Sequence, residues 1–225
     1  MHLHRSRSLT LLQAAVTVCV AGAPTRTSSL RALEQLSVDW RFVARGVRMP
    51  QERIVIVELD KEAFDKLKDP FIFWGRYFAR IVTTLHAFKA RAIGLDVLQP
   101  ESLTECVPPD NDPDQLFAQA LAQAPETVLI CAFDDLPDGT VERRDPTDQL
   151  SIALALAGGL LGYDHMTPDD DQVIRRHQLA DGTSKERQWS FPLALAVVAT
   201  SEQPQFRSSP PRIELGQRIV PTDAR

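Results

Sequence analysis

The sequence predicts a mixed α/β fold, with a partly parallel sheet flanked by helices in a single domain. Three features predict it: continuous β-branched segments typical of buried strands, amphipathic helices between them, and capping or turn residues at their boundaries. The chain has 225 residues, 44% of them hydrophobic, which is enough to bury one sizeable core. Its net charge of −5 and its lack of a basic run argue against a nucleic-acid-binding surface.

Residues 1–24 are expected to form a signal peptide or an N-terminal membrane anchor. Arg5 and Arg7 precede the mostly apolar segment 9–23. A basic start before about 15 apolar residues is typical of export signals, and it is shorter than the roughly 20 residues that span a bilayer comfortably. Positive charge ahead of the apolar segment favours a cytoplasmic N-terminus. The rest of the chain is therefore expected outside the cytoplasm.

Residues 25–37 carry leucines at helical spacing and are expected to form a linker or a membrane-proximal helix. The folded domain is expected to occupy residues 38–225. Segment 53–60 (RIVIVELD) predicts a buried strand, and segment 91–98 (RAIGLDVL) predicts a second. Between them lies an amphipathic helix at 76–89, so the unit is predicted to be a right-handed parallel crossover.

The second half of the chain continues the pattern of strands and helices. Asp112 and Pro113 are expected to begin a helix, and Ser190 is expected to cap another. The remaining predicted elements are strands at 127–133, 160–163 and 173–179, a hairpin within 134–145, and two short strands about a turn at Gly216.

Two aspartates lie at the carboxyl ends of the first two predicted strands, Asp60 and Asp96. Ligands bind at this edge of open parallel sheets. The two carboxylates can hold a divalent cation or act as an acid–base pair. Alternatively, they cap the segments that follow or form a salt bridge with Arg76. Trp74 beside Arg76 can form a cation–π platform or pack into the core, since it lies on the apolar stripe of its helix.

The stretch PDDDQVIRR at 168–176 combines three aspartates with two arginines. It fails as a calcium-binding loop, because counting from Asp169 the sixth position is Ile174 rather than glycine and the twelfth is Ala180 rather than glutamate. It is therefore expected to be a charged turn that enters a strand.

Alternation along that strand would send Arg175 and Arg176 to opposite faces, so that one of them pairs inward with a carboxylate. Asp171 and Arg175 are the candidates for this stretch. Gln172 is expected to adopt a less extreme backbone than the glycine usual at such a turn.

Few other residues suggest chemistry. Cys106 and Cys131 are the only pair of cysteines in the expected domain, and nothing in their spacing forces them together or suggests zinc. The histidines are scattered, and the sequence holds no glycine-rich phosphate loop, HExxH or GxSxG motif. No cofactor and no catalytic residue is expected.

In their order along the chain, several segments resemble the second type of CHASE domain, an extracytoplasmic sensor module of bacterial cyclases, histidine kinases and Ser/Thr kinases. The resemblance covers about residues 36–225, with Gly75 and Gln172 as departures from the family pattern. The matching segments are VDWRFVARG at 38–46, RIVIVELDKEAFDKL at 53–67, the segment 73–101, DQLFAQALAQAPETVLI at 114–130, DDDQVIRRHQL at 169–179, FPLALAVVA at 191–199 and IELGQRIVPTD at 213–223.

The resemblance implies that the domain detects a signal outside the cytoplasm for a membrane-bound receptor. The small-molecule or ionic signal is unknown, and the chain is expected to lack the family's C-terminal transmembrane and output regions. A homodimer is also expected, with a seam around residues 30–45. The alternatives are a periplasmic metal-dependent phosphohydrolase that uses the strand-end aspartates, or a dimerisation scaffold without a ligand. The candidate ligand-binding residues are Asp60, Trp74, Arg76, Asp96, Asp171 and Arg175.

Overall fold

The fold is built around a sheet with β2 (Thr127–Asp135) at its centre. The computed structural model describes residues 28–49, 53–103, 106–108, 111–136, 138–182 and 187–222. Strands β1 and β4 flank the first half of β2, and both run parallel to it. Strand β3 pairs antiparallel with the second half of β2, as the predicted hairpin requires. The strands are β1 (Ile93–Leu95), β2 (Thr127–Asp135), β3 (Val141–Arg144) and β4 (Leu160–Tyr163).

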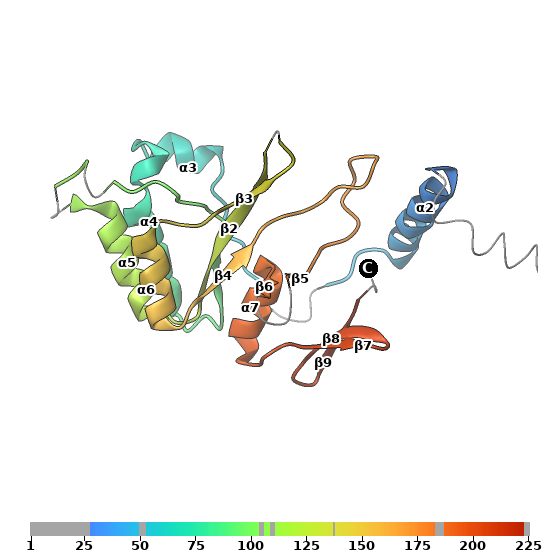
Figure 1. Ribbon diagram of the computed structural model, residues 1–225. Coiled ribbons are helices and arrows are strands. Elements are labelled where there is room, and N and C mark those ends of the chain that lie inside the picture. Colours follow the sequence, from blue (N-terminus) through green and yellow to red (C-terminus); the bar gives the residue numbers. More distant parts are fainter. Residues whose placement is uncertain are drawn as a thin grey trace, which may run out of the picture. The chain divides into compact units, whose positions relative to one another are not determined.

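Helices cover both faces of this sheet (Figure 1), namely α4 (Gly75–Ala87), α5 (Pro113–Gln123) and α6 (Asp148–Ala157) on one face and α7 (Phe191–Thr200) on the other. Alternation along β1 separates the two faces. Ile93 and Leu95 pack into the core beneath α4, α5 and α6. Gly94 faces α7, where an added Cβ would lie 2.7 Å from the ring of Phe191. The mixed α/β prediction with a partly parallel sheet is confirmed.

Two apolar clusters stabilise these layers. The larger one lies between the three helices and the sheet and includes Trp74, Leu121 and Leu150, all fully buried. The smaller one joins α7 to β8 (Pro211–Leu215) through Leu193 and Ile213. Burying a large apolar side chain contributes roughly 1.5–3 kcal/mol, so these clusters hold the helices against the sheet.

Side-chain caps fix where the helices begin. Asp112 accepts hydrogen bonds from the backbone of the first turn of α5, with Asp114 N at 2.9 Å. Ser190 accepts from Leu193 N at 3.5 Å and begins α7. Both caps confirm the sequence prediction, because a short polar side chain satisfies an N–H that has no partner within the helix.

Short elements complete the unit. The two strands predicted about Gly216 are β8 and β9 (Arg218–Pro221), and β7 pairs antiparallel with the other side of β8. The other short elements are α3 (Lys61–Lys66), the 3₁₀ turn η2 (Phe71–Phe73), β5 (Ala180–Asp181), β6 (Gln188–Trp189) and β7 (Gln205–Ser208).

The chain separates into two compact units, Met1–Glu58 and Leu59–Arg225. The first contains α2 (Ser28–Arg45), which extends beyond the predicted end of the linker at residue 37. The predicted signal peptide or anchor at 1–24 lies outside the described residues. Within the described residues, no helix is both long and apolar enough to cross a membrane.

Two strand predictions are wrong. Residues 53–60 form no strand, and Ile54, Val55 and Ile56 in that segment are all more than 70% exposed. Residues 173–179 also form no strand. A β-branched composition favours extended backbone, but a strand needs a hydrogen-bonded neighbour. Neither segment pairs with another strand of the described chain, so the predicted crossover between 53–60 and β1 is absent from it.

Candidate functional site

The carboxyl edge of the parallel strands carries a pair of acids. Asp96 directly follows β1 and Asp164 directly follows β4. The backbone N–H of Asp164 donates to Cys131 O at 3.1 Å, which holds this residue beside the middle of β2, where the pairing with β4 ends. Asp96 was predicted from the sequence to lie at this edge, and its partner Asp164 was not.

The two carboxyl groups interact directly. Partial loss of hydration raises the pKa of Asp96, and the charge of Asp164 and a hydrogen bond between the two side chains raise this pKa further. Two carboxyl groups can hydrogen-bond to each other only when one of them holds a proton. The pair can therefore share a proton. The described residues contain no group of three or more histidine, cysteine or acidic side chains placed to hold a metal ion.

Asp60 has a structural role. Its Oδ1 accepts a hydrogen bond from Ala63 N at 2.8 Å, which caps α3. This is the alternative that the sequence left open for Asp60, and it uses one of the carboxylate oxygens on the helix end. The alternative of a salt bridge to Arg76 is not what the structure shows, since Arg76 faces a different acid.

Trp74 and Arg76 both contact Asp69. Trp74 is fully buried, and its indole N–H donates to Asp69 O at 2.9 Å. The Tyr77 hydroxyl donates to Asp69 Oδ2 at 2.6 Å, and this bond is the main reason that the pKa of Tyr77 is raised.

Arg76 reaches the same Asp69 oxygen at 4.0 Å, and its guanidinium lies 5.9 Å from the centre of the Tyr77 ring. The predicted Trp74–Arg76 platform is therefore replaced by a contact with Tyr77. Trp74 instead packs against Phe64, with ring centres 4.6 Å apart. Core packing was the alternative that the sequence left open for Trp74, and the structure shows it.

Asp171 and Arg175 form a clamp in the loop that follows β4. Arg175 donates to both carboxylate oxygens of Asp171 at 2.8 Å and to Asp169 at 3.1 Å. The hydrogen bond from Arg175 lowers the pKa of Asp171 to about 2. The side chain of Arg175 is 7% exposed and that of Arg176 is 44% exposed, so one arginine points inward and the other toward solvent, as expected.

The turn of this loop differs from expectation. Gln172 has a φ of 63°, which lies in the left-handed region that glycine usually occupies. The expectation of a less extreme backbone is therefore wrong. A hydrogen bond from Gln172 N to Asp169 O at 2.8 Å and one from Asp169 N to Val173 O at 3.0 Å hold the conformation. Local hydrogen bonding outweighs the steric preference of the side chain here.

The six candidates therefore make separate sets of contacts. Asp96 interacts with Asp164 at the carboxyl edge, and Trp74 and Arg76 contact Asp69. Asp171 pairs with Arg175 in the loop, and Asp60 caps α3. None of the described contacts links these sets into a single site.

A pocket of about 250 Å³ lies beside β4, and sequence reasoning missed it. Its lining comes from four parts of the chain: Cys131 of β2, Arg143 of β3, Leu160, Leu161 and Tyr163 of β4, and Arg187, Gln188 and Trp189 around β6. These residues lie far apart in the sequence and follow no spacing motif. The parallel bridge between Tyr163 and Ser190, which brings β6 alongside β4, is a tertiary contact that no local pattern reveals.

The comparisons with known proteins give one match. Residues 14–225 match the family model of the CHASE2 domain, which covers nearly the whole chain. No curated protein and no solved structure matches.

Proposed function

The chain belongs to the CHASE2 domain family of extracytoplasmic sensor domains, and from this premise we propose that it is the sensory part of a membrane-bound bacterial receptor. The family match over residues 14–225 carries the proposal. In this proposal the domain lies outside the cytoplasm, residues 1–24 attach or export it, and a cyclase or kinase on the cytoplasmic side receives the signal. The family is sensory and not catalytic, so the proposal assigns no reaction to the carboxylates of the sheet edge.

A reporter fusion tests the location. Alkaline phosphatase, which folds to an active form only outside the cytoplasm, is fused after Arg225, and a cytoplasm-dependent fluorescent protein is fused at the same point in a second strain. We expect phosphatase activity without fluorescence. A matched strain that lacks residues 1–24 is the control and is expected to reverse the result. Fluorescence without phosphatase activity in the complete chain would overturn the extracytoplasmic assignment.

Ligand-dependent stability tests the sensing role. A molecule that binds only the folded chain raises its melting temperature by mass action, with about 2.7 kcal/mol of stabilisation at one hundred times the Kd. We expect at least one compound of a broad panel of ions and metabolites to raise the melting temperature of the purified chain. A panel without any such compound would count against direct sensing of a small molecule.

Helix α2 supports the further proposal that the receptor is a homodimer. Leu33, Leu36, Trp40 and Val43 follow one another at spacings of three, four and three, and each is more than half exposed. This is the a/d pattern of a two-stranded coiled coil. Two heptads are close to the lower limit of length for a stable isolated helix, so we propose that a second copy of α2 covers this seam, and that attachment to the membrane raises the local concentration of the two helices.

A charged residue in the seam tests the dimer. Leu36→Lys is expected to shift the complete chain toward monomer in light scattering or crosslinking, because two lysines would face each other across the seam. Gln35→Lys places the same charge one residue away, outside the a/d positions, and is expected to leave association unchanged. Equal behaviour of the two variants, or a monomeric wild type at high concentration, would remove the support for the seam.

A further inference from the structure

We propose that the pocket beside β4 binds a small organic carboxylate, an inference that rests on the sensory function proposed above. The volume of about 250 Å³ lies below the range of roughly 300–1,000 Å³ that is typical of sites for drug-sized molecules. At about 30 Å³ for each water molecule, the pocket has room for some eight waters. The ligand is therefore expected to have up to about eight non-hydrogen atoms.

The charge of the lining favours an anion. Burial raises the pKa of the Cys131 thiol. Burial, aided by the charge of Asp181, raises the pKa of the Tyr163 hydroxyl. Both groups are therefore neutral at physiological pH, and Cys131 is not a reactive thiolate there. Arg143 and Arg187 carry the only formal charges among the residues that line the pocket, and both charges are positive.

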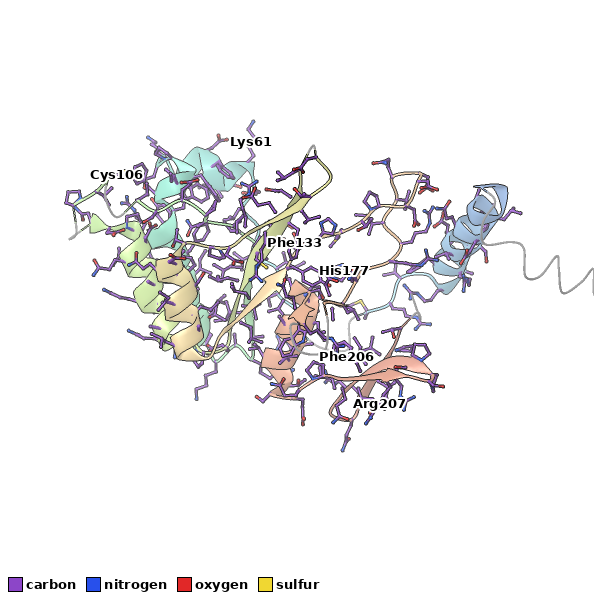
Figure 2. All side chains as sticks on the ribbon, in the orientation of Figure 1. Lys61, Cys106, Phe133, His177, Phe206 and Arg207 are labelled. Atoms are coloured by element: carbon purple, nitrogen blue, oxygen red, sulfur yellow. The ribbon has the colours of Figure 1, made fainter. Side chains whose placement is uncertain are left out.

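Arg187 is the expected anchor for the negative group. Its guanidinium lies 3.9 Å from the centre of the ring of Phe206, which is labelled in Figure 2. A ring that stacks on the flat face of a guanidinium leaves the N–H groups at its edge available for hydrogen bonds. Within the described part of the chain no acid pairs with Arg187, whereas Arg143 forms an ion pair with Asp145 at 2.6 Å. Arg143 is therefore expected to attract the anion electrostatically rather than to hydrogen-bond to it directly.

The walls of the pocket distinguish a carboxylate from inorganic phosphate. A planar carboxylate matches the fork of N–H donors on a guanidinium through two parallel hydrogen bonds. Leu160, Leu161 and Trp189 supply apolar surface beside the two arginines. A short hydrocarbon group can occupy that surface, while the inorganic phosphate ion has no such part. The pocket thus suits a small molecule with a carboxylate at one end and an apolar body at the other.

The test uses the purified complete chain and calorimetric titration with butyrate and other short carboxylates of four to eight non-hydrogen atoms. Butyramide, which has the same shape as butyrate without its charge, and inorganic phosphate are the comparison ligands. We expect at least one carboxylate to bind, and its neutral amide to bind at least about tenfold more weakly. Tenfold corresponds to about 1.4 kcal/mol, near the low end for a hydrogen bond to a charged group.

Two variants place the binding in this pocket. Arg187→Gln is expected to weaken carboxylate binding at least about tenfold, and Arg143→Gln less, because Asp145 already offsets part of its charge. The matched control is Arg80→Gln, which removes the same charge from an exposed position on α4. Thermal melting of each variant without ligand shows whether it is folded, and if Arg187→Gln is not, the Arg143→Gln result decides.

Three results would overturn the pocket assignment: no short carboxylate binds the wild type, Arg187→Gln binds as tightly as the wild type, or phosphate binds more tightly than every carboxylate. These failures are distinct from a failure of the sensory function. A ligand found in the broad panel whose affinity is unchanged in Arg187→Gln would place sensing elsewhere on the domain. A cytoplasmic reporter result would reject the sensory function itself, whatever the pocket binds.

Discussion

Asp96 and Asp171 are two acids that the sequence singles out as ligand candidates, and the structure gives them opposite electrostatic environments. Asp96 faces Asp164, another acid, and its pKa is raised. Asp171 faces Arg175, and its pKa is lowered to about 2. The first is an interaction between like charges at the edge of the sheet, and the second is an ion pair within a loop.

The difference shows which of the two acids already has a structural partner. The carboxylate of Asp171 already accepts two hydrogen bonds from a buried guanidinium, so a ligand would have to replace a satisfied partner. The carboxyl groups of Asp96 and Asp164 repel each other when both are ionised, and binding of a proton or a cation reduces this repulsion. Asp171 therefore stabilises its loop, while Asp96 and Asp164 remain responsive to their surroundings.

The largest expected change in stability comes from removing the guanidinium of Arg175. Arg175→Met removes the guanidinium that donates to both Asp169 and Asp171. We expect a clear loss in the free energy of unfolding, larger than that of any other variant described below, because the buried guanidinium and its hydrogen bonds to both carboxylates are removed. Urea denaturation at pH 7 measures it.

The adjacent arginine gives a matched control. Arg176→Met removes the same group from a side chain that is 44% exposed, and the expected change is below about 0.5 kcal/mol. If Arg175→Met and Arg176→Met lower the free energy of unfolding equally, the contacts of Arg175 with Asp169 and Asp171 do not stabilise this loop. The proposed structural role of Asp171 would then be wrong.

The pH dependence of Asp171 has a defined sign. Its folded pKa is depressed, so its stabilising contribution is complete above the ordinary aspartate pKa and is lost as the pH falls through about 2. We expect Asp171→Asn to be less stable than the wild type at pH 7 and to approach it at pH 2. Urea midpoints from pH 7 to pH 2 measure the gap, and a gap that stays constant over this range would show that ionisation of Asp171 is not involved.

The strands show how far the sequence predicts the fold. Segment 160–163 was predicted as a strand and is β4, because β2 lies beside it and α7 covers it. Segment 53–60 has a more strongly β-branched composition, yet it is exposed and irregular. Composition therefore predicted extended backbone, and the presence of a neighbouring strand decided the outcome. Helix starts were more predictable, since caps such as Asp112 and Ser190 act within one turn.

The candidate sites follow the same rule. One inward arginine in the 168–176 stretch was predicted correctly although the strand that the prediction assumed does not form, because the carboxylates that pair with Arg175 lie only a few residues away. Asp164 was missed because its partner Asp96 lies on another strand, and the only available signal was its position directly after β4. The pocket around Arg187 was missed because it forms where β6 meets β4, and no sequence spacing records that contact.

The smallest expected effect concerns the acid pair. The folded pKa of Asp96 is raised, so the cost of ionising it is absent below the ordinary aspartate pKa and grows as the pH rises through the folded value. Asp96→Asn removes that cost. We expect it to be more stable than the wild type at pH 7 by about 0.5 kcal/mol, a small value because solvent screens the pair, and equal to it near pH 3.

A double-mutant cycle separates repulsion from other roles of Asp96. Asp164→Asn removes the same repulsion from the other side, so the double variant is expected to gain less than the sum of the two single gains. Additive gains would mean that the carboxyl groups do not interact. A loss of stability in Asp96→Asn at pH 7 would mean instead that the bond through the shared proton outweighs the repulsion, and the pair would then stabilise the edge of the sheet as Arg175 stabilises the loop.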